Sequence, residues 1–219
     1  MSVAELISAF GRLSTTNVSD ALDKMSLRGT AIGILPKFQC NKIIGRAVTL
    51  KVTAAGLTSS GRHLGVDAIE SSHQGDIIVI DNGGRQDVSC WGEILSVGSK
   101  SKGVAGVVID GAFRDLDAIR PLGFPVYARA VVPLTARGRV MQEASNVIIQ
   151  CGGVQVRPQD IVMADDNGVV IVPTEKAREV LTTATEFYEK ECEMIKDIQR
   201  GLSISDVDKK YRYEEMTRH

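Results

Sequence analysis

The first apolar positions of the chain are spaced as on one face of a helix: Val3, Leu6, Ile7 and Phe10. The chain is therefore predicted to open with an amphipathic helix. A second helix is predicted to begin near Asn17, whose side chain can accept a hydrogen bond from amides around Asp20. Gly29 and Gly33 then punctuate a loop.

The middle of the chain contains short runs typical of β-strands. Residues 45–53 (GRAVTLKVT) alternate in polarity, which predicts a strand, and a helix is expected near residues 64–72. Residues 76–81 (DIIVID) and 104–110 (VAGVVID) are continuously apolar. Such runs are typical of strands that are buried on both faces of a parallel sheet.

Helical segments separate and follow these apolar runs. One is predicted over about residues 91–102, and a shorter one over 114–122, closed by Gly123 and Pro125. The order strand, helix, strand, helix predicts a parallel βαβ unit with a right-handed crossover.

The last third of the chain is predicted to contain short strands, then a long helix, then a charged tail. Four short β-rich runs are separated by turn sequences such as CGG and DDNG, which predicts antiparallel or mixed pairing: residues 146–150, 153–156, 160–164 and 168–172. Thr174 is then predicted to cap a long helix from Glu175 to about Arg200, and a charged tail follows. We therefore predict an α/β fold, with a mixed sheet around a parallel βαβ centre, flanking helices and a long C-terminal helix.

Composition narrows the class of protein. Apolar residues make up 43% and charged residues 24%, which is typical of a globular domain, so one domain is predicted over residues 1–219. The net charge of −1 and 5% aromatic residues argue against nucleic acid as a partner. No apolar run approaches the ~20 residues that cross a bilayer, so no membrane partner is expected.

The four cysteines lie far apart, without the short spacings of a zinc site: Cys40, Cys90, Cys151 and Cys192. We expect free thiols in a reducing compartment. Because the first residues also lack the pattern of a signal peptide, the expected location is cytoplasmic.

The candidate chemistry lies in the loops that follow the two apolar strands. Loops that leave the carboxyl ends of adjacent parallel strands meet at one edge of the sheet. The segment after Asp81 leads to Glu93, and the segment after Asp110 carries Arg114 and Asp115. Twenty residues separate Glu93 from Arg114, enough for one helix and one returning strand. The three side chains are therefore expected to converge.

These residue types suit a hard cation and an anionic substrate. Asp115 can offer oxygen to Mg²⁺ or Mn²⁺, and Glu93 can hold a metal-bound water. The planar fork of Arg114 can bind a carboxylate or an enolate at two points. The turn at Gly92 is expected to present the amides of Ile94 and Leu95 to a substrate carboxylate.

Ordinary structural roles compete with these assignments. An Arg-Asp pair is a common start to a helix, and Gly83-Gly84 is more often a turn than a phosphate site. His63 and His73 are interpreted as structural or surface residues. The DDNG sequence makes Asp165 and Asp166 turn formers, and Asp110 suits a hydrogen-bond partner at a strand end.

Several motifs together resemble one known family, the RraA-like proteins, which have a swivelling-domain type of fold. The resemblance covers most of the chain and rests on NVSDAL, GDIIVIDNGG, WGEIL, VVIDGAFRD and RPQDIVMADDNGVVIVP. One branch contains the 4-hydroxy-4-methyl-2-oxoglutarate/4-carboxy-4-hydroxy-2-oxoadipate aldolases, which also decarboxylate oxaloacetate. The non-catalytic branch inhibits a ribonuclease and tends to lose the Asp after the Arg, whereas this chain keeps Asp115.

The resemblance implies roles for individual residues. Asp115 would bind the metal, Glu93 would support a metal-bound water, and Arg114 would contact the substrate and stabilise its enolate. The aldolases often have an acidic residue three places after the Asp, where this chain has Ala118, with Asp117 beside it.

The predicted final helix carries one acidic residue on its apolar stripe. Glu191 falls on the face formed by Ala177, Leu181, Ala184, Tyr188, Ile195 and Ile198. A carboxylate there either reaches water at the edge of the stripe or has a partner. In the family, an acidic residue of this helix completes the neighbouring subunit's metal site through water. Its place before Ile195, Ile198 and Gly201 favours Glu191 over Glu189.

Taken together, the residues and the resemblance predict a metal-dependent enzyme, a class II pyruvate aldolase. It would cleave a 4-hydroxy-2-oxo diacid to pyruvate and a second oxo acid, and decarboxylate oxaloacetate. The resemblance implies a homotrimer or homohexamer, in which residues 174–200 form an interface helix and 201–219 a tail. The alternative is a non-catalytic protein that binds and regulates a ribonuclease.

Overall fold

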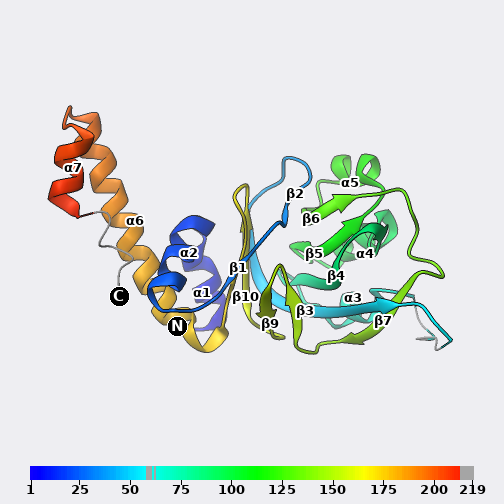
Figure 1. Ribbon diagram of the computed structural model, residues 1–219. Helices are drawn as coiled ribbons and strands as arrows, with labels where there is room; N and C mark the ends of the chain where they lie inside the picture. The colour runs from blue at the N-terminus through cyan, green and yellow to red at the C-terminus, as the bar shows by residue number, and fades with distance from the viewer. Residues whose placement is uncertain (58–60, 62, 213–219) are drawn as a thin grey trace. The chain divides into compact units, whose positions relative to one another are not determined.

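The computed structural model describes residues 1–57, 61 and 63–212 (Figure 1). Its contacts separate two compact units. One consists of residues 1–28 and the C-terminal segment from Glu175, and the other of residues 29–174. The single domain expected over residues 1–219 stays a prediction.

The 29–174 unit is built on a nine-stranded sheet with the order β1-β11-β10-β3-β4-β5-β6-β2, in which β7 pairs with β3. A separate hairpin is formed by β8 and β9. The strand bounds are Thr30–Ala31 (β1), Leu35–Pro36 (β2), Ile43–Ala54 (β3), Ile77–Ser89 (β4), Gly106–Phe113 (β5), Val126–Val131 (β6), Val140–Ser145 (β7), Ile149–Cys151 (β8), Val154–Val156 (β9), Ile161–Asp165 (β10) and Gly168–Val172 (β11).

The predicted parallel centre is confirmed and extends over four strands. The pairs β3·β4, β4·β5 and β5·β6 are all parallel. The connections contain α3 (Val66–Ser71), α4 (Glu93–Ser101) and α5 (Leu116–Leu122), and Figure 1 shows α4 and α5 beside the strands that they connect. The later strands pair antiparallel, as β10 does with both β3 and β11, so the fold is the predicted mixed α/β type.

Both faces of the central strands are buried, as the continuous apolar runs predict. Ile78 and Ile80 belong to the core on the side of the helices, where Trp91 and Ile119 also lie. Their neighbours in β4 point to a second core, which is completed by the β8–β9 hairpin and by β10 and β11. Each such buried side chain contributes about 1.5–3 kcal/mol of transfer free energy.

The segment after Asp81 differs from the prediction of a loop. Strand β4 continues through it to Ser89, with two register shifts against β5. Gly83 (φ 62°) and Gly84 (φ 72°) adopt left-handed conformations there, which glycine tolerates and which bulge the strand.

Four strands are absent from the prediction: the two-residue strands β1 and β2, and the longer strands β6 and β7. In β6 the β-type run is interrupted by the charged Arg129, which forms an ion pair with Asp110 across the sheet. In β7 the sequence VMQEAS lacks the alternation of a half-buried strand, and pairing with β3 holds it in the sheet. Tertiary contacts thus decide both segments.

The other unit consists of helices: α1 (Val3–Phe10), α2 (Thr15–Lys24), α6 (Ala177–Gln199) and α7 (Ile204–Tyr211). The predicted first helix is confirmed and starts with a capping box from Ser2 and Glu5. The predicted start of the second helix at Asn17 is wrong by one turn. Ser14 is the cap, and Asn17 returns the second hydrogen bond of the box, as its acceptor, 3.1 Å from the Ser14 amide.

The long C-terminal helix is confirmed, with a different start. A 3₁₀ turn, Thr174–Lys176, precedes α6, which has no side-chain cap. Thr174 donates instead to the carbonyl of Gln159, 2.5 Å away. The predicted stripe is buried only in the first half of α6, because Ile195 and Ile198 are 53% and 41% exposed.

The segment predicted as a charged tail contains α7. The buried carboxylate of Asp197 in α6 accepts hydrogen bonds from Lys210 (2.5 Å) and Tyr211 (2.9 Å), and Val207 is buried beneath. These two hydrogen bonds lower the pKa of Asp197. The sequence shows only alternating charge here, so the pairing that folds the helix is not visible in it.

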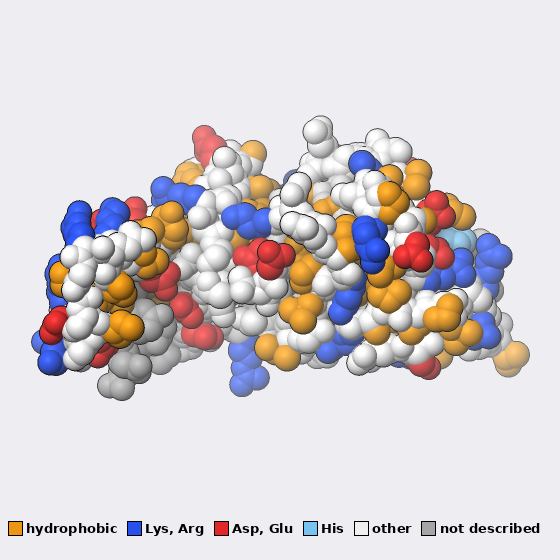
Figure 2. Space-filling model, turned by 90° about the horizontal axis from the view of Figure 1, so that it is seen from above, with side chains coloured by type: hydrophobic (Ala, Val, Ile, Leu, Met, Phe, Trp, Pro, Cys, Tyr) orange, Lys and Arg blue, Asp and Glu red, His pale blue; other side chains and the backbone are white. Residues whose placement is uncertain are grey.

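Charges of both signs are mixed with apolar side chains on the face of the molecule that Figure 2 shows. Among the described residues, none of the helices combines the length and apolar character needed to span a membrane.

Candidate active site

The segment around Glu93 and the segment around Arg114 lie against each other. The backbone amide of Arg114 donates to the carbonyl of Trp91 (3.0 Å). The amide of Glu93 donates to Oδ2 of Asp115 (3.1 Å). Residues that are far apart in the sequence are therefore joined by two hydrogen bonds at the carboxyl ends of β4 and β5.

Asp115 has an unusual backbone conformation for a residue with a side chain. It precedes α5 with φ 65° and ψ 33°, in the left-handed region, and its side chain does not cap α5. The carboxylate turns to the start of α4 instead, and its Oδ2 lies 3.4 Å from Nε of Arg114. The Arg114 and Asp115 side chains are 37% and 36% exposed, so solvent and ligands reach both.

Gly92 provides the space for this arrangement. A Cβ atom at this position would lie 2.5 Å from Oδ2 of Asp115 and 3.4 Å from Cγ of Arg114. Its backbone is extended (φ −166°), so the requirement is steric rather than conformational. The absence of a side chain also leaves the first turn of α4 without a cap from Gly92 itself. The amides of Ile94 and Leu95 in this turn are therefore available to an anionic ligand.

A buried hydrogen-bonded pair supports the turn beneath. The indole Nε1 of Trp91 donates to Oγ of Ser96 (2.9 Å), which donates to the carbonyl of Gly92 (3.0 Å). Trp91 is only 2% exposed and belongs to the core. Sequence reasoning does not identify this support, because only the fold shows that residues five apart face each other here.

These residues line a cleft of about 630 Å³ within the 29–174 unit. All six residues predicted from the sequence in this unit contribute to its walls: Gly92, Glu93, Ile94, Leu95, Arg114 and Asp115. The prediction omits Thr135 and Arg137, which come from the segment between β6 and β7, and Met141, which comes from β7. It interprets His63, another lining residue, as a structural or surface residue. No sequence signal links that segment to the site, because neither β6 nor β7, which it connects, is predicted from the sequence.

Other candidates have structural roles. Asp110 forms an ion pair with Arg129 and accepts a hydrogen bond from the Gly152 amide (2.7 Å), which confirms it as a strand-end partner. Asp165 accepts from the Asn167 amide (2.9 Å) in the turn between β10 and β11, as predicted for a turn former.

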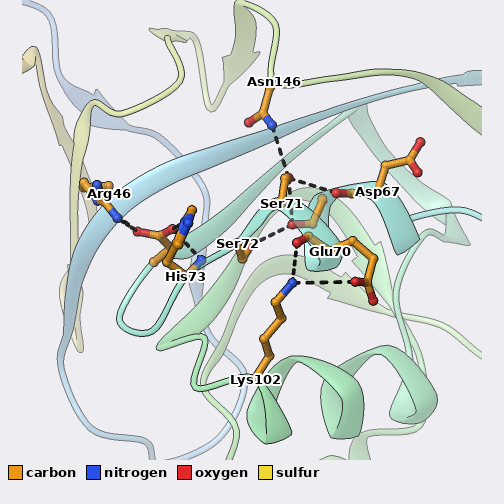
Figure 3. Close-up of polar contacts among 10 residues, drawn as sticks. Arg46, Asp67, Glu70, Ser71, Ser72, His73, Lys102 and Asn146 are labelled. Atoms are coloured by element: carbon orange, nitrogen blue, oxygen red, sulfur yellow. Dashed lines mark hydrogen bonds and ion pairs between the residues drawn. The ribbon is translucent and has the colours of Figure 1, made fainter.

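His73 belongs to a polar network at the entry to β4. Its backbone amide donates to Asp76 (2.8 Å), and Arg46 binds the other oxygen of the same carboxylate (3.0 Å). In Figure 3 Arg46 and His73 approach this buried carboxylate, while Lys102 and Glu70 pair nearby. The network fixes the turn before β4, and none of its members lines the cleft.

Burial disfavours the reactive thiolate form of the cysteine in the cleft wall. Cys90 is fully buried, and burial raises its pKa to about 12. All four cysteines are free, as expected, although Cys40 and Cys192 are only partly buried.

The donor set at the cleft suits a hard divalent cation. Asp115 uses Oδ2 for its two contacts, while its other oxygen has no protein partner among the described residues. The described part of the chain holds no cluster of three or more His, Cys, Asp or Glu suited to a metal. One or two carboxylates plus water fit Mg²⁺ or Mn²⁺, which keep several waters, and do not fit structural zinc.

Glu191 lies in the helical unit and has a partner within the chain. Its Oε2 accepts a hydrogen bond from Nδ2 of Asn17 (2.7 Å). Asp20 lies nearby, and burial, followed by the charges of Glu191 and Asp23, raises the pKa of Asp20. A carboxylate on the apolar face of α6 is thus explained by α2, and its contribution to a neighbouring subunit's metal site stays a prediction. Glu189 is exposed.

The fold and the site define the class: this is a mixed α/β protein in which one cleft contains an Arg-Asp pair and the N-terminus of a helix. The chain belongs to the RraA-like family: the family described as Aldolase/RraA matches residues 15–171. The resemblance identified from the sequence motifs is therefore confirmed.

Individual relatives agree with this assignment. The chain is 35% identical to "Putative 4-hydroxy-4-methyl-2-oxoglutarate aldolase" of Halalkalibacterium halodurans over 84% of the chain and 85% of the relative. It is 29% identical to Protein DlpA of Legionella pneumophila over 92% of the chain, and spans 33% of that relative's length. Among solved structures, an uncharacterized protein from Pseudomonas syringae pv. tomato has a TM-score of 0.85 at 27% identity, covering 94% of this chain and 97% of that one.

The name of a second solved structure refers to ribonuclease inhibition. It is the Streptomyces coelicolor protein called an unusual member of the RNase ES inhibitor RraA protein family, with a TM-score of 0.80 at 29% identity. The match covers 90% of this chain and 96% of that one. Relatives named as aldolases and as ribonuclease inhibitors thus share the fold, so the site must decide between the two activities.

Proposed function

We propose that this protein is a divalent-metal-dependent lyase that cleaves a 4-hydroxy-2-oxo diacid to pyruvate and a second oxo acid. It would decarboxylate oxaloacetate at the same site. The observation that carries the proposal is the junction of Arg114, Asp115 and the first turn of α4 in one accessible cleft. The names of several relatives support the aldolase class.

Asp115 is the residue proposed to hold Mg²⁺ or Mn²⁺, with Glu93 acting through a water molecule. When bound, the ion would polarise the C2 carbonyl and the C1 carboxylate of a 2-oxo acid. The hydrogen bond from the Glu93 amide orients the Asp115 carboxylate, and Gly92 leaves room for it. Because the side chain does not cap its own helix, the second oxygen of Asp115 would be available to the ion.

The chain's own donors would bind the 2-oxo acid end of the substrate. The amides of Ile94 and Leu95 at the start of α4 donate to the C1 carboxylate. Arg114 donates to the C2 oxygen, and this contact strengthens as the C3–C4 bond breaks and negative charge develops on that oxygen. Arg114 therefore stabilises the enolate more than the substrate, as catalysis requires.

A proton must leave the C4 hydroxyl for the aldol bond to break. The carboxylate of Glu93, at the first residue of α4, is exposed to the cleft and is proposed to hold the water that accepts this proton. No lysine lines the cleft, so a Schiff-base route has no nucleophile among the described residues.

The experiment follows pyruvate release from 4-hydroxy-4-methyl-2-oxoglutarate and from oxaloacetate, before and after EDTA. Activity should disappear when the chelator strips the metal and return with Mg²⁺ or Mn²⁺. Asp115→Asn, which keeps size and tolerates the left-handed backbone, should fold normally and show no metal-dependent turnover. Full turnover in the metal-free protein, or in Asp115→Asn, would overturn the proposal.

The alternative function is regulation of a ribonuclease through protein binding, which the name of one structural relative suggests for that relative. Retention of Asp115 beside Arg114 favours the enzyme. The absence of pyruvate from either substrate, with Mg²⁺ bound to the protein, would favour the regulator. We further propose a cytoplasmic homotrimer or homohexamer, as the family resemblance implies.

A further inference from the structure

The cleft contains a second arginine that the proposed chemistry does not use. Arg137 lines the same cleft as Arg114 and Asp115, and its side chain is exposed. It forms no ion pair with any carboxylate in the described residues. An arginine that faces a ligand cleft without a protein partner has its five donors available to an anion.

The loop that carries Arg137 is fixed to the two segments that build the site. In the 132–139 loop, which connects β6 to β7, the amide of Val132 donates to the carbonyl of Phe113 (2.9 Å). The hydroxyl of Ser89 donates to the carbonyl of Leu134 (2.6 Å). Phe113 directly precedes Arg114, and Ser89 lies just before Trp91. The loop is therefore held at a defined place relative to the catalytic pair.

The tip of the loop is a stable turn. The carbonyl of Ala136 accepts hydrogen bonds from the amides of Arg139 (2.9 Å) and Val140 (3.0 Å), and the Ala136 side chain packs against the core. Gly138 adopts the left-handed conformation (φ 71°) that the turn needs. Thr135, Ala136 and Gly138 of this loop also line the cleft, and Arg137 is the charged residue that the loop contributes to its wall.

Charge determines what this arginine can recognise. The acidic groups that line the cleft, Glu93 and Asp115, repel a second substrate carboxylate, whereas Arg137 attracts it. The volume of about 630 Å³ lies well within the ~300–1,000 Å³ range of small-molecule sites. It leaves room beyond the 2-oxo acid end.

We propose that Arg137 binds the carboxylate farthest from the 2-oxo group and so determines the preference of the cleft for 2-oxo diacids over 2-oxo monoacids. The inference rests on the proposed function, which assigns Arg114 and the α4 amides to the other end of the substrate. Arg137 acts on binding rather than on bond cleavage, so its contribution is measurable without turnover.

The test compares two acids of equal chain length that cannot undergo the aldol cleavage. With Mg²⁺ present, 2-oxoglutarate carries a carboxylate where 2-oxopentanoate carries a methyl group, and calorimetry measures the dissociation constant of each. Arg137→Gln should weaken 2-oxoglutarate about tenfold and change 2-oxopentanoate less than about twofold, since a charge-assisted contact at an exposed site is partly screened. Arg137→Lys, which keeps the charge without the fork, should be intermediate.

The control is Arg120→Gln, which removes an exposed positive charge from α5 outside the cleft and should leave both affinities unchanged. The advantage of 2-oxoglutarate in the parent should also shrink as NaCl is raised, and Arg137→Gln should lack this salt dependence. Equal losses of affinity for both acids, or no loss for 2-oxoglutarate, would overturn the role of Arg137 but not the proposed function. If neither acid binds the parent protein with Mg²⁺, the proposed function fails, and this inference fails with it.

Discussion

At the scale of single residues, the site depends on where side chains are absent as much as on where they are present. Asp115 approaches the start of α4 because Gly92 has no Cβ atom, and Arg114 packs beside the same position. The residue types at the site are readable from the sequence, because Arg, Asp and Glu carry recognisable chemistry. The steric need for Gly92 is not, since it arises only when β5 brings Asp115 back to this turn.

Gly92→Ala should disable the site while the fold survives. The added methyl group would lie 2.5 Å from Oδ2 of Asp115, so the carboxylate must move away from the Glu93 amide. A displacement of about 1 Å at a catalytic group can cost about 100-fold in rate, and we expect a loss of that order in kcat/KM for pyruvate release. Circular dichroism and the melting temperature should show that the variant is folded.

Gly98→Ala in the same helix is the matched control. Apart from the backbone of the helix itself and the adjacent residues, no described atom lies within 4 Å of the Cβ position there. A glycine inside a helix costs about 0.5–1 kcal/mol relative to alanine. This variant should therefore melt at a slightly higher temperature and keep full activity. If Gly92→Ala were as active as Gly98→Ala, the steric role of Gly92 would be wrong.

At the scale of elements, the hydrophobic pattern predicts those that pack on both faces or along one stripe. The apolar runs of β4 and β5 and the stripe in the first half of α6 are readable because burial alone specifies them. The exceptions are elements held by polar partners. Arg129 lies in β6 because Asp110 pairs with it, and α7 is held by Asp197, so pattern alone cannot reveal either.

The packing of α2 against α6 contains a carboxylate that opposes folding. The pKa of Asp20 is raised in the folded state, so folding favours the protonated form of this side chain. The stability that this preference contributes is fully present below the ordinary pKa of 3.8 and is lost as pH rises through the folded pKa. Asp20→Asn removes the charge and should raise the melting temperature at pH 7 by about 1–3 °C. The difference from the parent should shrink as pH falls toward 3.

Asp23→Asn serves as the comparison in this pH series. Asp23 is exposed and is the smallest of the named causes of the shift at Asp20, so its removal should have a weaker effect at pH 7. Should Asp20→Asn lower the melting temperature at pH 7, the carboxylate would be stabilising and this account of α2 and α6 would be incorrect.

At the scale of the whole molecule, the predicted assembly assigns Glu191 a second role. Its hydrogen bond to Asn17 explains its half-buried position within one chain, whereas the family resemblance assigns it to a neighbour's metal site. Glu191→Gln keeps an oxygen that can accept from Asn17 but removes the charge. The variant should therefore fold normally, and loss of its activity would report on the site rather than on stability.

Subunit mixing tests this second role directly. Glu191→Gln and Arg114→Ala should each be nearly inactive alone, and a reassembled mixture should regain activity. Some interfaces would then pair an intact Arg114 loop with an intact Glu191 helix. Mass spectrometry of tagged chains must first show that subunits exchange. A mixture that exchanges and stays inactive, or a fully active Glu191→Gln, would show that Glu191 does not act across an interface.

The left-handed backbone of Asp115 has a consequence for how such a site can be lost in evolution. Most residues pay a penalty of roughly 1–3 kcal/mol in this conformation, but asparagine and glycine adopt it readily. Both are reached from an aspartate codon by a single nucleotide change. Either substitution would remove the proposed metal ligand with little cost to folding. Selection for a stable fold would therefore not oppose the loss of the proposed activity, and the resulting protein would keep its fold and its surface.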